Sequence, residues 1–340
     1  MNVFTSYLEK LGANFLVAAM VPSLAFVIAI ILVFDPILNI PALFEDQSGV
    51  YQLIGLSLLL AIPTIIIGFT LTALNTYILK LFEGYVFWRR FPFMRAAHQR
   101  KANRLILRQE ALKRRIEIVE SYGAQTNRTK RVLLRLRKQY YLVSADYDHS
   151  YPPSQDEILP TRFGNILKAS ESYPNTRYGI DGVEFWPRLI HVIPPEYQQS
   201  IDGTRNELSF LVNMSILAIG FFLLCILAIF YTFAGPALRT STIPPEFVGF
   251  GNTIRYSLAG LLALTINIGF NRASVYSVGA FGMMVRSAYD LFRLDLLEKF
   301  RLQVPENSVD EFHKWKNLNE LIVLGPKSLE FEPLEYDLEK

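Results

Sequence analysis

The chain has 340 residues, of which 51% are hydrophobic and 19% are charged, and its formal net charge at pH 7 is +3. The apolar residues are gathered in long uncharged runs, which excludes a soluble protein whose apolar positions are dispersed over two domains. The single cysteine, Cys225, excludes an intramolecular disulfide and a thiolate metal cluster.

Three uncharged apolar runs predict transmembrane helices. They cover about residues 15–34, 53–75 and 210–233, and each reaches the roughly 20 helical residues that cross a hydrocarbon core. Lone strands are excluded because their backbone groups stay unpaired in lipid. The first run is too long for the core of a signal peptide, so we expect it to be retained.

A fourth apolar run contains Arg272, and two frames are open. The span covers about 247–270 with Arg272 at its cytoplasmic edge, or it lies deeper and buries this arginine. An arginine at the bilayer centre costs at least about 2.5–3.5 kcal/mol. The first frame is therefore the prediction, with the helix continuing past Arg272 into the cytoplasm.

The basic residues orient the predicted spans. Residues 80–140 hold 17 Lys and Arg but only 4 Asp and Glu, whereas the connector 35–51 holds three acids and no basic residue. Because basic residues collect on the cytoplasmic side of a membrane, we expect both termini in the cytoplasm. The predicted regions are a transmembrane hairpin at 1–79, a basic cytoplasmic region at 80–208, a second transmembrane hairpin at 209–272, and a cytoplasmic helical extension with an acidic tail at 273–340.

The basic cytoplasmic region begins with a predicted antiparallel helical hairpin. Pro92 is expected to end or bend the helix that leaves the second span. Gly123 is the expected stop of the next helix, and Thr126 or Asn127 is expected to cap the one after it. One apolar face runs along the first helix of the pair: Leu105, Leu112, Ile116 and Val119.

The excess of positive charge on this hairpin has two interpretations. It is an ordinary solvated surface that reflects the orientation rule, or it attracts anionic lipid headgroups, at about 1 kcal/mol per basic residue near the surface. Nucleic acid is not the expected partner, because no recognisable nucleic-acid-binding module accompanies the charge.

Residues 162–194 mix rigid, aromatic and basic positions upstream of the third span. A short helix is expected to break at Tyr173-Pro174, and Gly179 and Gly182 permit tight turns. Because Trp and Tyr favour the headgroup zone, one interpretation places residues 173–194 at the inner membrane face. The alternative is a core turn with a buried Trp. The predicted membrane-interface residues are Tyr173, Tyr178, Phe185, Trp186 and Arg188.

Two segments resemble known sequences. The stretches LNTYILKLFEGY at 74–85 and RFGNILKASESYPNTRYGIDGVEFWPRL at 162–189 are similar to segments in a group of uncharacterised bacterial four-span inner-membrane proteins. The resemblance covers the exit of the second span and the middle of the chain. It implies a bacterial inner-membrane location and assigns no functional residue.

The C-terminal region has a helical and an acidic part. Ser308 and Glu311 match a capping box, and the helix is expected to run to Gly325-Pro326. Residues 302–340 hold 9 acids and 4 basic residues. The acidic tail either docks on the basic hairpin, within one subunit or between subunits, or stays solvated.

Motifs of catalysis are missing from the sequence. The four histidines form no HExxH pair, and neither a phosphate-binding loop nor a nucleophile elbow is present. Asp146, Asp148 and His149 lie within four residues of one another. They are either a weak metal-binding motif or an ordinary polar loop. We therefore expect no enzyme, cofactor or metal. The first three spans also lack ionisable side chains, which argues against an ion-coupled transporter.

Two spans carry stripes of small and polar residues at helical spacing. One interpretation is close helix packing with side-chain hydrogen bonds. The other is a water-filled path around an oligomer axis, with Arg272 favouring anions at its cytoplasmic mouth. The second span contributes Ser57, Ala61, Thr64, Gly68, Thr72 and Asn75, and the fourth contributes Ser257, Gly260, Ala263, Asn267, Asn271 and Ser274.

The sequence thus predicts an all-α integral membrane protein with four spans and a mainly helical cytoplasmic region. The leading functional hypothesis is a homo-oligomeric channel gated through that region. The alternative is a non-conducting membrane anchor, for signalling or defence, that binds a cytoplasmic partner. A membrane-bound enzyme remains only through Asp146–His149.

Overall fold

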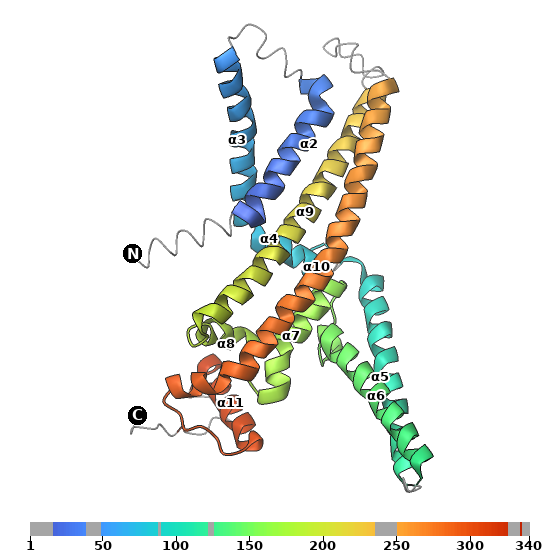
Figure 1. Cartoon of the computed structure of the whole chain (residues 1–340), viewed down its shortest axis with the longest axis vertical. Coiled ribbons are helices and arrows are strands. Elements are labelled where there is room, and N and C mark those ends of the chain that lie inside the picture. The colour runs from blue at the N-terminus through green and yellow to red at the C-terminus, as the bar shows by residue number, and fades with distance from the viewer. Residues whose placement is uncertain are drawn as a thin grey trace. The chain divides into compact units, whose positions relative to one another are not determined.

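The computed structural model describes residues 16–38, 49–87, 90–121, 126–234, 250–325 and 334, and these residues form helices without any strand (Figure 1). The predicted all-helical class is therefore confirmed over this part of the chain. The elements are η1 Leu16–Met20, α2 Val21–Leu38, α3 Gly49–Ala73, α4 Asn75–Glu83, α5 Pro92–Ser121, α6 Asn127–Ser150, η4 Gln155–Glu157, α7 Arg162–Tyr178, α8 Gly182–Leu189, α9 Pro195–Ala234, α10 Phe250–Lys299 and α11 Ser308–Val323.

Four of the described helices are long and apolar enough to cross a membrane, which agrees with the four runs that the sequence predicted. By length and composition the candidate spans are Val17–Asp35, Gly49–Ala73, Pro195–Phe233 and Gly251–Lys299. The last lies in α10, which continues without a break from Phe250 past Arg272 to Lys299, as expected. Residues 247–249 of the predicted fourth span lie outside the described residues.

The chain divides into two compact units. Unit 1 comprises residues 1–79 and 205–277, and unit 2 comprises residues 80–204 and 278–340. Each unit therefore takes one part from each half of the chain.

Unit 1 is held together by aromatic and small residues from α2, α9 and α10. The ring of Phe34 stacks on Tyr256 with centroids 5.4 Å apart and meets Phe221 edge-on at 5.8 Å. The buried Cys225 belongs to the same cluster. Arg255 donates a hydrogen bond to the carbonyl oxygen of Leu32, so a charged side chain also joins α10 to α2.

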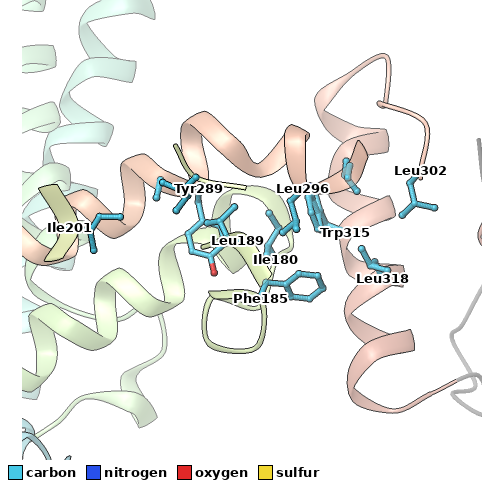
Figure 2. Packing of buried hydrophobic residues seen from close by; sticks show 12 residues of the cluster. Ile180, Phe185, Leu189, Ile201, Tyr289, Leu296, Leu302, Trp315 and Leu318 are labelled. Atoms are coloured by element: carbon cyan, nitrogen blue, oxygen red, sulfur yellow. The ribbon is translucent and has the colours of Figure 1, made fainter. Parts of the chain in front are cut away.

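The core of unit 2 is built from two distant segments of the chain. Phe185 of α8 and Trp315 of α11 are both 0% exposed, and their rings meet edge-on at 5.5 Å. Tyr289 of α10 is equally buried and donates a hydrogen bond to the carbonyl oxygen of Gly182, 2.7 Å away. Figure 2 shows these side chains converging between α8, α10 and α11.

Helices α5 and α6 lie side by side as an antiparallel hairpin, as the sequence predicted (Figure 1). Leu112 and Val143 are buried in it, and Gln109 donates a hydrogen bond to the Ser144 hydroxyl across the pair at 2.8 Å. Thr126 caps α6 by accepting from the backbone N–H of Thr129. The expected stop at Gly123 lies outside the described residues.

The end of α4 is locked to the start of α7. Gly84 ends α4 with φ +99°, and a Cβ there would come within 2.7 Å of the Pro160 ring. The Thr161 hydroxyl donates to the carbonyl oxygen of Glu83 at 2.8 Å and also caps α7. A Cβ on Gly164 would overlap that same carbonyl oxygen. The junction therefore depends on the absence of two side chains.

Pro92 neither ends nor bends the helix after the second span. That helix, α4, already ends at Glu83, and Pro92 is the first residue of α5. The N–H that proline lacks is unpaired in the first turn of any helix, so proline is well suited to this position.

Two further local predictions are wrong. Pro174 does not break α7, which continues to Tyr178 and closes where Gly179 adopts φ +77° and its N–H bonds to Asn175. The cap of α11 is Asn307, whose side chain accepts from the N–H groups of the second and third residues after it. Ser308 is therefore already inside the helix.

Candidate functional site: the basic hairpin and the polar stripes

The polar stripe of α3 is used partly for packing. Thr64 and Gly68 are buried, whereas Ser57 and Thr72 are exposed and Asn75 is half-buried. The hydroxyls of Ser57, Thr64 and Thr72 each donate to the backbone carbonyl four residues earlier in the same helix. Helix α3 packs against α2 and η1, and small residues such as those of the buried part of the stripe allow close approach of helices.

The polar stripe of α10 divides into two parts. Gly260 is buried, and a Cβ there would lie 3.3 Å from the Cβ of Cys225 on α9. The Asn267 side-chain amide donates to the carbonyl oxygen and the hydroxyl of Ser215 on α9, at 2.8 and 2.9 Å. This stretch of the stripe joins two helices of one subunit.

The remaining positions of the α10 stripe differ in exposure. Ser257 is half-buried, Ser274 is buried, and Asn271 and Arg272 are exposed. The exposed part of the α10 stripe is therefore the stretch around Asn271 and Arg272.

One polar residue of the third span has a structural role that was not predicted. Asn213 of α9 is buried, and its side-chain amide donates to the carbonyl oxygen of Ala18 at 2.7 Å. An asparagine within an otherwise apolar run was the signal that could have identified this contact.

The segment expected at the membrane face contributes Phe185 to a protein core. Phe185 is completely buried against Trp315. It lies in helix α8 and not in a turn, so the alternative of a core turn with a buried Trp is met only in that the segment joins a protein core. Trp186 is half-buried beside Tyr289, and Arg188 is half-buried with its guanidinium 5.7 Å from the Phe185 ring centroid. For Trp186 and Arg188 a membrane-interface position stays a prediction.

The two predicted interface tyrosines bind a residue that the sequence analysis did not single out. Tyr173 and Tyr178 of α7 both donate hydrogen bonds to Asp290 of α10, at 3.0 and 2.7 Å. Burial, followed by the hydrogen bond to Asp290, raises the pKa of Tyr178 above its ordinary range. These hydroxyls fix α7 to α10.

Asp290 belongs to a charged row on α10. Arg286 donates to the carbonyl oxygen of Asp148 at 2.9 Å, and Arg293 forms an ion pair with Glu311 of α11 at 2.6 Å. The spacing of Arg286, Asp290 and Arg293, at steps of four and three, could have revealed the row. It binds α10 to three other helices of unit 2.

The weak metal motif is part of the same structure. The carbonyl oxygen of Asp148 accepts the Arg286 hydrogen bond, and His149 lies against Gly279. Burial, and then the charge of Arg286, lowers the pKa of His149. Among the described residues, no group of three His, Cys, Asp or Glu could hold a metal ion.

A cavity of about 560 Å³ lies beside the junction of α4 and α7, lined among others by Tyr85, Arg95 and Lys168. Lys168 pairs with Glu171 at 3.6 Å. Close by, burial and then the charge of Glu171 raise the pKa of Glu83 to about 6. The cavity mixes basic and acidic groups and points to no particular ligand.

The hairpin α5–α6, residues 92–150 and called the basic hairpin below, carries the strongest charge feature of unit 2. It contains fourteen Lys and Arg and five Asp and Glu, a net charge of +9. All fourteen basic side chains are exposed. An ion pair described within the hairpin joins Arg137 to Glu120 at 2.7 Å, on the surface.

The basic hairpin also exposes apolar side chains. Val132, Leu134, Tyr141 and Leu142 of α6 and Phe93, Leu107 and Ile118 of α5 are all exposed. Their neighbours Leu112 and Val143 are buried between the two helices. The buried face of α5 and the excess of charge were predictable from the sequence, whereas the apolar residues on the outer sides were not among the predicted features.

Compared with protein-family models, curated proteins and solved structures, the chain gives no match. The resemblance to bacterial four-span inner-membrane proteins stays a prediction.

Proposed function

We propose that this chain is a membrane-anchored, non-catalytic binding protein of a bacterial inner membrane. Its four spans fix unit 2 at the cytoplasmic side, where the basic hairpin binds an anionic partner. The observation that carries the proposal is the exposure of all fourteen basic side chains of the hairpin, interleaved with exposed apolar ones.

The way in which two separated chain segments form unit 2 supports anchoring by membrane spans. The core of unit 2 joins residues 180–201 to residues 288–318. The apolar stretches 210–233 and 247–270, predicted as the third and fourth spans, lie between these segments in the chain. Two segments can share a core only on one side of a membrane, which requires an even number of crossings between them. The excess of Lys and Arg in residues 80–140 favours the cytoplasmic side.

The binding role can be tested on the full chain in nanodiscs of phosphatidylcholine, with fluorescent polyglutamate as the anionic probe. Arg131→Glu with Lys138→Glu reverses two charges of the basic hairpin. We expect this variant to bind the probe more weakly and with a smaller dependence on salt. The matched control, Arg162→Glu with Arg177→Glu, changes two exposed arginines of α7 and should bind as the unmodified chain does. Equal losses in both variants would contradict a specific role of the hairpin.

A homo-oligomeric channel is the second candidate, and the exposed Asn271 and Arg272 on α10 favour it. In proteoliposomes, Arg272→Gln should reduce the preference for anions over cations if these residues line a path. Asn267→Ala is the comparison, because Asn267 bonds to Ser215 within the subunit and should affect stability instead. Absence of protein-dependent flux excludes this candidate.

A further inference from the structure

Helix α6 has two apolar sides, and only one of them is covered by α5. Val143 and Tyr147 are buried in the hairpin. Leu134, Tyr141 and Leu142, at i, i+7 and i+8, lie on the opposite side, where they are 66%, 71% and 55% exposed. This outward face carries exposed apolar side chains on a helix whose other side is already covered by α5.

Basic residues surround these side chains, without acidic ones among them. Residues 127–145 contain six Lys and Arg and no Asp or Glu. Lys138 stands between Leu134 and Leu142 on the same side, and Arg131 precedes Leu134 by one helical turn. The full set is Arg128, Lys130, Arg131, Arg135, Arg137 and Lys138, all of them exposed.

The outward side of α5 has a different composition. Leu107 and Ile118 are exposed there but lie eleven residues apart, and α5 includes Glu110, Glu117 and Glu120. Because each helix turns its buried side toward the other, the outward sides of α5 and α6 point in opposite directions. A flat surface can therefore cover the outward side of α6 without covering that of α5.

The combination of basic and large apolar side chains on the α6 face favours a lipid surface over a nucleic acid as its partner. A nucleic acid backbone would pair with the basic residues but would leave three large apolar side chains without apolar contact. The interfacial zone of a bilayer accepts both, since apolar groups enter to about 5–10 Å while Lys and Arg stay at the phosphates. The chain is also tethered by four apolar spans, so the bilayer is present at a high effective concentration.

We propose that the outward face of α6 lies on an anionic lipid surface. Leu134, Tyr141 and Leu142 enter the interfacial zone, and the basic residues of the same face, Arg131 and Lys138 above all, bind lipid phosphates. This inference rests on the proposed function and names its partner as the anionic leaflet of the membrane.

The test uses the full chain with Cys225→Ala, which removes the single cysteine. Leu134→Cys carries an environment-sensitive nitrobenzoxadiazole label on the α6 face, and Leu107→Cys carries it on the α5 face as the matched control. Both proteins are placed in nanodiscs with and without phosphatidylglycerol. We expect blue-shifted emission and quenching by brominated lipid at position 134 only, and only with phosphatidylglycerol present.

Charge variants test the basic residues. Arg131→Gln with Lys138→Gln should raise the phosphatidylglycerol content needed for half-maximal emission at position 134 severalfold, since each basic residue near the surface contributes about a factor of five in affinity. Arg104→Gln with Arg108→Gln on α5 removes the same charge and should leave the phosphatidylglycerol content needed for half-maximal emission unchanged.

Equal behaviour at positions 134 and 107, or a label at 134 that stays in water, overturns the inference. If polyglutamate binding then persists, the proposed binding role stands and the partner is not the bilayer. If the hairpin variants leave polyglutamate binding unaffected as well, both proposals fail.

Discussion

Gly164 has the tightest steric requirement of the junction between α4 and α7. A Cβ at this position overlaps the carbonyl oxygen of Glu83, a backbone atom held by the Thr161 hydroxyl at 2.8 Å. Gly164→Ala should therefore lower the free energy of unfolding by about 3 kcal/mol, the upper part of the usual range for overpacking. The measurement is thermal unfolding of the detergent-solubilised full chain.

Gly203→Ala is the control for that substitution. Gly203 lies within α9, and a Cβ there meets nothing within 4 Å. Alanine should stabilise this helix by up to about 1 kcal/mol through its better helix propensity. Similar losses at both glycines would show that crowding at Glu83 is not the cause.

Glu83 gives this junction a dependence on pH. Its pKa is raised from 4.5 to about 6 by burial and then by Glu171. Between these two values the folded chain binds a proton that the unfolded chain has released, so stability falls as pH rises from about 4.5 to about 6. Glu83→Gln should flatten the melting temperature over this window and raise it at pH 7.

The same substitution at the exposed Glu110 controls for the loss of one carboxylate. Glu171→Gln offers a second check, because removal of its charge should shift the window at Glu83 toward lower pH. A profile that keeps its slope in Glu83→Gln assigns the effect to another group.

Single residues were predictable where one local interaction decides the outcome. Thr126 was one of two caps expected for α6, beside Asn127, because both residue types favour the position before an amphipathic run; the structure has Thr126 as the cap. Ser308 was not the cap of α11, because Asn307 stands one position earlier and Glu311, the other half of the motif, pairs with Arg293. That partner lies 18 residues away in sequence, beyond the reach of a local motif.

At the scale of elements, α9 and α10 are joined by a close approach at Gly260. A Cβ there lies 3.3 Å from Cys225 Cβ and 3.6 Å from the Phe222 ring. Gly260→Leu should separate the helices, destabilise the chain by about 1–3 kcal/mol and speed the reaction of the buried Cys225 with a maleimide. The control is Gly269→Leu, because a Cβ at Gly269 meets nothing within 4 Å; it should change neither the stability nor the reactivity of Cys225. Equal reactivity of Cys225 in the two variants would argue against close packing at Gly260.

The elements themselves were predictable from period and composition, but the use of their faces was not. The stripe of small and polar residues on α10 could be read from the sequence. Which of its members pack could not: Gly260 and Asn267 contact α9, whereas Asn271 is exposed. In the same way, the aromatic character of residues 173–189 fits a headgroup zone and a protein core equally well. The position of Trp315, more than a hundred residues later, decides in favour of the core for Phe185.

For the whole molecule, the four apolar helices followed from length and composition, whereas the assembly of unit 2 did not. Hydrophobic periodicity is local, and nothing in it indicates that residues 180–201 share a core with residues 288–318. Once that core is known, however, it limits the membrane topology independently of the charge rule. The number of crossings between the two segments has to be even.

This requirement can be tested with single cysteines in the Cys225→Ala chain. Gln139→Cys in α6 and Ser308→Cys in α11 are both exposed positions of unit 2, and Gln47→Cys lies in the first connector. An impermeant maleimide applied to intact cells should label position 47 and leave 139 and 308 unlabelled until the cells are permeabilised. Labelling of both 139 and 308 from outside would reverse the orientation but keep the shared core. Opposite accessibility of 139 and 308 is incompatible with the core, because residues on two sides of a bilayer cannot pack Phe185 against Trp315.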